Sequence, residues 1–229
     1  MKETGLIFQS WGVRAIIAGT KTQTRRTRGL ESLNCNPGLW SDPQVGHDPR
    51  FWIFSGEHGR RMVRCPYGVP GDFIYIKEGF STCALGVYPC PQAWYRADFD
   101  QFDDPAKNLE HTCPPEYQDR LSQKYANFAD CFACVREREG PFRWQSSMYM
   151  PRRLARYVRE LTEVRVQRVQ EISEEDARAE GVEAPVVGES SGYRGRYAIE
   201  WNRLNAKRGH GWDVNDWVWA LTFGRMSPA

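Results

Sequence analysis

Side chains that could carry chemistry are concentrated between Gly19 and Arg26, in the stretch GTKTQTRR. A threonine hydroxyl is a poor nucleophile until a base removes its proton. A lysine can act as that base when burial or a neighbouring cation lowers its pKa. Composition alone favours a plainer interpretation, in which the stretch is a solvated edge strand whose charges prevent association with other strands. The residues by themselves leave both interpretations open.

The cysteines form a second candidate site. Cys131 and Cys134 make a CxxC pair, Cys90 and Cys113 lie upstream of it, and His111 is nearby. Four thiolates could hold a structural zinc ion in tetrahedral geometry. Because only one CxxC is present, the spacing favours scattered reduced cysteines over a zinc site. The sequence therefore predicts at most one structural zinc, on these four cysteines, and no cofactor for catalysis.

Composition limits the classes of protein that the chain can belong to. Of 229 residues, 41% are apolar and 13% aromatic, which predicts a packed core. The net charge of +2 is too small to indicate nucleic-acid binding, so any basic surface must be local. The first residues do not resemble a secretion signal, and no apolar run approaches the length of a membrane span. We therefore expect a cytoplasmic protein without membrane contact.

Several regular elements are expected around the stretch from Gly19 to Arg26. A helix should begin near Ser10 and end at Gly19. A capping box at Ser173 should open a short helix that Gly181 closes. The expected strands are Leu6–Phe8, Phe73–Ile76, a strand pair or one long bent strand over Val158–Val169, and Trp217–Phe223, with a further helix over Tyr197–Leu204.

Two segments show no clear periodicity. Residues from about 27 to 65 are rich in glycine, proline, asparagine and aspartate, and residues from about 81 to 145 carry five of the seven cysteines. We expect both to be irregular insertions on one domain that spans residues 1–229. Since a long structureless loop is unusual in a compact domain, short helices or a metal should order the second one.

Four ordered blocks of the chain resemble ASCH-domain proteins. The first is Gly19, Lys21 and Arg26, similar to the family signature Gly-x-Lys-x-x-x-x-Arg after the first helix. The others are Gly71–Glu78, Val164–Val182 and the closing strand Trp217–Phe223. Met150-Pro151-Arg152 is similar to phage and prophage members. The resemblance covers about half of the chain and implies an α+β fold, a PUA-like β-barrel with flanking helices and large loop insertions.

The resemblance also implies a function. Some small ASCH proteins are amidohydrolases that remove the acetyl group from N4-acetylcytidine, and their proposed catalytic lysine, threonine and glutamate match Lys21, Thr24 and Glu180. The candidate substrate-binding residues are Arg26, Glu78 and Arg152. Arg26 would stabilise the oxyanion of the reaction or bind a phosphate. Other ASCH proteins are described as RNA-binding or ribonuclease-like. The alternative is therefore a non-catalytic module that binds RNA or single-stranded DNA.

The proposed catalytic set has one geometric requirement. Side chains alternate along a strand, so Lys21 and Thr24 would point to opposite faces if both lay in one regular strand. They share a pocket only if Lys21 precedes the strand or a bulge intervenes. We expect Lys21 to lie in the turn after Gly19.

Overall fold

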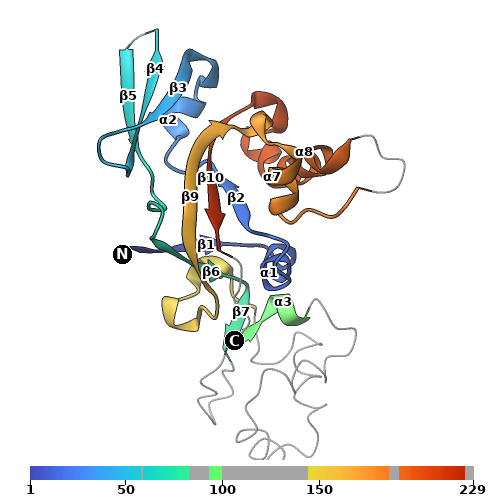
Figure 1. Ribbon diagram of the computed structural model, residues 1–229. Helices are drawn as coiled ribbons and strands as arrows, with labels where there is room; N and C mark the ends of the chain where they lie inside the picture. Colours follow the sequence, from blue (N-terminus) through green and yellow to red (C-terminus); the bar gives the residue numbers. More distant parts are fainter. Residues whose placement is uncertain (58, 83–92, 100–143, 186–190, 225–229) are drawn as a thin grey trace, which may run out of the picture. The chain divides into compact units, whose positions relative to one another are not determined.

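Strands and short helices are interspersed along the chain, which confirms the mixed α+β class (Figure 1). A computed structural model describes residues 1–57, 59–82, 93–99, 144–185 and 191–224. The chain divides into two compact units, Met1–Thr4 with Ala15–Ile74 and Arg159–Ala229, and Gly5–Arg14 with Tyr75–Val158. One domain over residues 1–229 stays a prediction.

The largest sheet of the described residues has the strand order β1-β6-β9-β10-β2. β10 pairs antiparallel with β9 on one side and β2 on the other, so that Trp219 lies opposite Val166 and opposite Arg26. β9 is one long strand rather than a strand pair, and Figure 1 shows it curving beside β10. The strands are β1 (Glu3–Ile7), β2 (Gln23–Arg26), β6 (Phe73–Lys77), β9 (Val158–Arg168) and β10 (Trp217–Phe223).

Helix boundaries follow the predicted capping residues. The first helix begins at Ser10, and Gly19 follows its end with φ 73°, a left-handed conformation that glycine adopts without strain. The Ser173 hydroxyl accepts a hydrogen bond from the Asp176 amide at 3.1 Å, as predicted for the next helix start, and Gly181 follows with φ 74°. None of the helices in the described ranges is long and apolar enough to cross a membrane. The helices are α1 (Ser10–Ile17), α2 (Glu31–Asn34), α3 (Arg96–Phe99), α7 (Glu174–Ala179) and α8 (Gly192–Asn205).

One core cluster of the first unit packs α7 and α8 against the segment that follows β9 and against β10. The helix predicted over residues 197–204 is part of α8 and supplies Tyr197 and Trp201, both 5% exposed. The two rings lie 6.1 Å apart, and their burial fixes α8 over this end of the sheet. The cluster consists of Val169, Ile172, Ala177, Val182, Tyr197, Trp201 and Val218.

The segment expected to be irregular between residues 27 and 65 is regular over much of its length. It contains α2 and an antiparallel sheet of β3 (Trp40–Val45), β4 (Phe51–Gly56) and β5 (Gly59–Arg64). Trp52 and Phe54 of β4 make edge-to-face contacts with Trp219 and Trp217, at 6.2 and 5.3 Å between ring centroids. The prediction of an irregular insertion was therefore wrong here, because aromatic burial orders a segment whose glycines and prolines suggested loops.

The second unit contains a short hairpin and a small core. β7 (Phe80–Thr82) pairs antiparallel with β8 (Ala93–Tyr95), with Phe80 opposite Tyr95. Phe80 and Met150 are buried together, and Leu154 packs against them. Most of the insertion predicted between residues 81 and 145 lies outside the described residues.

Candidate functional site

Lys21 and Glu180 lie against each other in the first unit although they are 159 positions apart in the chain. The Lys21 Nζ donates to Glu180 Oε2 at 2.6 Å and to the Glu180 backbone carbonyl, also at 2.6 Å. Each residue is only 4% exposed. Glu180 is therefore not an ordinary solvated charge, and the structure brings together two of the three residues that the resemblance implied.

Two left-handed glycines allow this close approach. After Gly19 the chain turns back, and the amides of Thr20 and Lys21 both donate to the Ala15 carbonyl. On the other side, Glu180 caps α7 directly before Gly181. A Cβ atom on Gly181 would lie 2.7 Å from the Lys21 Cβ, so only glycine fits both the backbone angle and the space.

Arg25 holds the other oxygen of the Glu180 carboxylate. Its Nη1 donates to Glu180 Oε1 at 3.1 Å and its Nη2 donates to Asp176 Oδ2 at 2.8 Å. Gln23 donates to the second Asp176 oxygen at 2.8 Å and accepts from Arg25 Nη1 at 3.1 Å. Gln23 and Arg25 are both buried. β2 is thus an edge strand of its sheet but not the solvated one that composition alone favoured.

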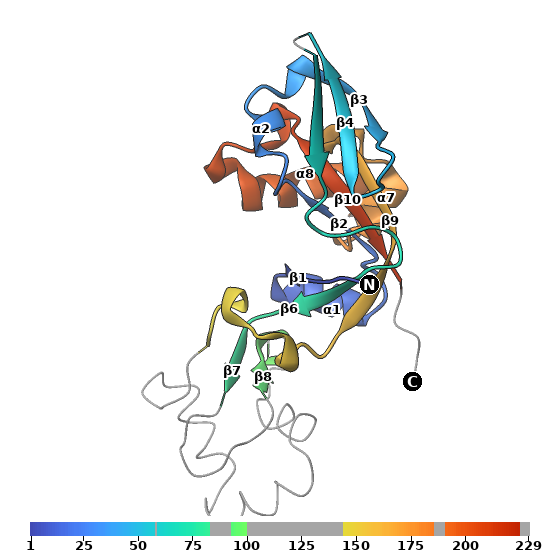
Figure 2. The ribbon, with the colours of Figure 1, turned by 90° about the vertical axis from the view of Figure 1, so that its left-hand side faces the viewer.

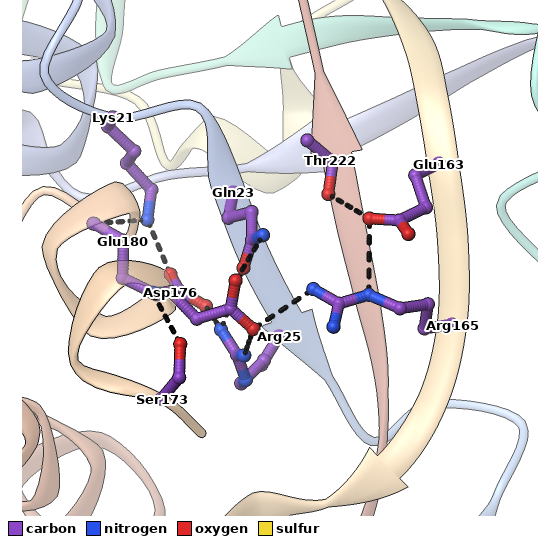
Figure 3. Close-up of polar contacts among 9 residues, drawn as sticks. All are labelled: Lys21, Gln23, Arg25, Glu163, Arg165, Ser173, Asp176, Glu180 and Thr222. Carbon is purple, nitrogen blue, oxygen red and sulfur yellow. Dashed lines mark hydrogen bonds and ion pairs between the residues drawn. The ribbon is translucent and has the colours of Figure 1, made fainter. Parts of the chain in front are cut away.

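The ion pairs continue across the sheet, as Figure 3 shows. Arg165 on β9 donates to Asp176 Oδ2 at 2.9 Å, and its Nε pairs with Glu163 at 3.1 Å. The Thr222 hydroxyl on β10 donates to the same Glu163 carboxylate at 3.1 Å. The network therefore runs from the buried Lys21 to the more exposed side chains of β9.

Burial lowers the pKa of Lys21 from its usual value of 10.5, because the charged ammonium loses its hydration. The charge of Glu180 and its hydrogen bond raise the pKa, whereas the charges of Arg26 and Arg25 lower it further. The net effect is a lowered pKa of Lys21. A buried lysine with a lowered pKa releases its proton more readily than an ordinary lysine, which is the property required of a general base.

Arg26 and two tyrosines extend the electrostatic surroundings of this pair. Burial lowers the pKa of Arg26, while Tyr67 and Glu180 raise it. Burial also raises the pKa of Tyr197 well above 10, and Arg25 lies 5.7 Å from the centroid of the Tyr197 ring. Burial raises the pKa of Tyr67 to about 12. Both tyrosines are therefore neutral hydroxyls at physiological pH.

Thr24 does not share the contacts of Lys21 and Glu180. β2 begins at Gln23, so Lys21 precedes the strand as expected. Thr24 lies between Gln23 and Arg25, whose side chains both contact Asp176, and strand alternation directs it to the opposite face. Thr24 is 4% exposed and pairs in register with Leu221. Among the described residues, no hydrogen bond joins Thr24 to Lys21 or Glu180, and its role as nucleophile stays a prediction.

Glu78 and Arg152, expected to bind substrate, belong to the second unit. Glu78 is 1% exposed and binds Arg156 through two hydrogen bonds, of 2.8 and 3.0 Å. The Arg156 guanidinium in turn lies 4.0 Å from the centroid of the Tyr95 ring, and Arg152 lies 5.4 Å from that of Tyr75. These contacts give Glu78 a structural partner, and substrate binding by Glu78 and Arg152 stays a prediction.

The four cysteines predicted to bind zinc, Cys90, Cys113, Cys131 and Cys134, lie outside the described residues. Within the described part of the chain, no group of three or more histidine, cysteine, aspartate or glutamate side chains could hold a metal ion. Cys35 and Cys65 are free thiols, the first exposed and the second buried. The zinc prediction is therefore open.

Sequence reasoning missed Asp176 and Gln23 as members of the site. The only available signal was position: Asp176 is the third residue of α7, which places it one turn before Glu180 on the same helix face. Gln23 and Arg25 are two residues apart on a strand, which puts their side chains on one face. A search with family models and comparisons with curated proteins and with solved structures found no match to the chain.

Proposed function

We propose that the chain is an ASCH-type amidohydrolase on a PUA-like core, which removes the acyl group from N4-acetylcytidine or a related modified pyrimidine nucleoside. The observation that carries the proposal is the buried Lys21–Glu180 pair, in which burial lowers the lysine pKa and Arg25 holds the carboxylate. Both members match residues that the resemblance to ASCH proteins implies. The mixed α+β fold is compatible with a PUA-like core.

The proposed chemistry uses Lys21 as general base and Glu180 as its partner. Neutral Lys21 accepts a proton from the nucleophile as the nucleophile attacks the acyl carbon. Glu180 then offsets the charge of the lysine ammonium until the proton passes to the N4 nitrogen, the C–N bond breaks and cytidine leaves. If the nucleophile is water, breakage of the C–N bond releases the carboxylic acid directly. If it is the Thr24 hydroxyl, an acyl-threonine ester forms, and a water molecule then cleaves this ester and releases the acid.

Mutation can decide whether the nucleophile is Thr24 or a water molecule. The resemblance assigns it to Thr24, whereas the alternation of β2 favours a water molecule on the face of Glu180. Thr24→Val keeps the shape of the side chain and removes the hydroxyl. If Thr24 is the nucleophile, turnover falls at least 1000-fold and Thr24→Ser restores part of it. If water is the nucleophile, Thr24→Val retains most turnover, while Lys21→Arg loses about 100-fold or more in both cases.

Turnover is measured as the release of cytidine from N4-acetylcytidine, which chromatography detects. Since Lys21 and Thr24 are buried, each variant must be assayed below its own melting temperature, determined by circular dichroism. Lys21→Met serves as a second lysine variant that leaves no base and no charge. An inactive wild-type protein, folded and tested against several N4-acylated cytidines, would overturn the enzyme proposal.

The rival function is binding of RNA or single-stranded DNA at the same site without catalysis. The ion pairs speak against it, because Nη1 and Nη2 of Arg25 already donate to carboxylates and Lys21 binds Glu180. The rival function assigns Arg26 to a phosphate. Undetectable turnover together with salt-dependent strand binding that Arg26→Gln abolishes would favour the rival.

A further inference from the structure

The sheet of β3, β4 and β5 has one face that packs against β10 and one face that points away from it. Trp52 and Phe54 point from β4 toward Trp219 and Trp217 of β10. Because side chains alternate along a strand, the residues between and beside them point to the other face. This outer face carries Phe51, Ile53 and Ser55 of β4, all partly exposed.

The register of β5 adds basic residues to the outer face. Arg64 lies opposite Phe51, Met62 opposite Ile53 and Arg60 opposite Ser55. These three residues of β5 are exposed, Met62 to 66%. β5 is the edge strand of the sheet, and Figure 2 shows it alongside β4. The outer face therefore combines an apolar centre, made of Phe51, Ile53 and Met62, with an arginine at each end of β5.

Positive charge in this sheet is concentrated in β5. Residues 40–64, which span the sheet, contain four arginines and three acidic residues, a balance of +1. One of the acidic residues, Asp48, accepts hydrogen bonds from Arg50, whose Nε donates to its Oδ1 at 2.9 Å and to its Oδ2 at 3.0 Å. β5 itself has three arginines and no acidic residue. Edge protection alone would need only isolated charges of either sign, not arginines on both sides of an apolar patch.

We propose that this outer face binds single-stranded nucleic acid, with Arg60 and Arg64 on phosphates and Phe51 stacked on a base. Exposed arginines along an apolar and aromatic sheet surface match the chemistry of single strands, whose bases have free faces for stacking and whose backbone is anionic. β5 is about 20 Å long, which accommodates a few nucleotides. The surface is separate from Lys21 and Glu180 in its residues, and the proposal does not depend on hydrolase activity.

Fluorescence anisotropy with short labelled oligo-uridine and oligo-thymidine tests the surface in the full chain. Wild type should bind at least one of the two at low salt, with affinity that falls steeply as salt rises. Arg60→Gln with Arg64→Gln should reduce the magnitude of the slope of log K against log salt by about 1.4, because two phosphate contacts are lost. Phe51→Leu should weaken binding about tenfold and leave that slope unchanged.

The matched control is Arg203→Gln with Arg208→Gln, which removes the same charge from exposed positions at the end of α8 and just after it. The control should bind like wild type. Equal binding by the two double variants, or no binding of either polymer by wild type, would overturn the proposal. Preference for labelled polyglutamate, lost in the Arg60/Arg64 variant, would overturn it in favour of an acidic protein partner. Hydrolysis of free N4-acetylcytidine should be unchanged in this variant, so the two proposals fail independently.

Discussion

Lys21 stands out among the described residues because it is costly to bury an ionisable amine and this one is 4% exposed. Its Nζ finds two acceptors on one residue, the side chain and the carbonyl of Glu180. A methionine of similar length would fill the space without the loss of hydration. Positions where a sequence departs from such a simple solution are frequently functional, and this is the argument for a catalytic lysine that does not depend on the resemblance.

Glu180→Gln tests the electrostatic coupling of this pair. Glutamine keeps an oxygen that can accept from the Lys21 Nζ but removes the negative charge that raises the lysine pKa. The pKa of Lys21 should therefore fall further. The rising limb of the pH profile of kcat/KM should move to lower pH, although the maximal rate drops because the lysine ammonium loses its counter-charge. Proton titration of ¹³C-labelled lysine by NMR should show the same displacement.

Glu175→Gln is the matched control for this change. Glu175 lies on the same helix, is exposed, and loses the same charge. Neither the pH profile nor the Lys21 titration should move in this variant. A rise in the Lys21 pKa in Glu180→Gln, or equal displacement in both variants, would contradict the assignment of Glu180 as the partner.

The pairing of Lys21 with Glu180 could not be derived from local pattern. Spacing describes neighbours within one helix or strand, whereas this contact joins residues 159 positions apart. Only the resemblance to ASCH proteins connected them. The roles of Asp176 and Gln23 were missed for a similar reason, since a polar helix face looks the same in sequence whether it faces solvent or a buried arginine.

At the scale of elements, the end of α7 and the turn after α1 must approach closely for the site to form. Gly181→Ala tests this, because it adds a methyl group 2.7 Å from the Lys21 Cβ at a residue with φ 74°. Gly209→Ala is the control: its φ is 82°, but nothing lies within 4 Å of the added atom. Gly209→Ala should cost about 1 kcal/mol from the backbone alone.

Gly181→Ala should cost clearly more than its control, about 3 kcal/mol, because strain and overlap add. Chemical denaturation of both variants measures the difference in the free energy of unfolding. Lys21 should also titrate differently in Gly181→Ala, as the pair is displaced. Equal losses in the two glycine variants would show that the close approach is unimportant.

Elements with strong local signals were predicted well, and elements held by distant contacts were not. The structure confirms the helix start at Ser10, the capping residue Ser173, the glycine stop at Gly181 and the strand Trp217–Phe223. β3 was missed because Pro43 and a register shift between Ser41 and Gln44 interrupt its alternation. Its sheet is instead ordered by the contacts of β4 with β10, which no local pattern contains.

At the scale of the whole molecule, the ion-pair network links elements from distant parts of the sequence. Asp176 on α7 binds Arg25 on β2 and Arg165 on β9, so one carboxylate connects three elements. Neither composition nor net charge indicates such a connection, since the chain is nearly balanced in charge. The stability of the first unit should therefore depend on the ionisation of this residue.

Asp176→Asn measures that dependence across pH. Burial by itself raises the pKa of Asp176, but the hydrogen bonds from Gln23 and Arg165 and the charge of Arg25 bring it below the usual 3.8. A carboxyl group with a lowered pKa stabilises the folded state fully above about pH 4, and this contribution disappears as the pH falls through the lowered pKa. The variant should therefore be less stable than wild type at pH 7. The expected loss is about 2 kcal/mol and not more, because the side chain is partly exposed and solvent weakens its ion pairs. The difference should shrink steadily below pH 4 in urea unfolding experiments, whereas the exposed Asp213→Asn should show little difference from wild type at any pH. A deficit in Asp176→Asn that stays constant from pH 7 to pH 3 would mean that shape, and not the ionised carboxylate, holds the three elements together.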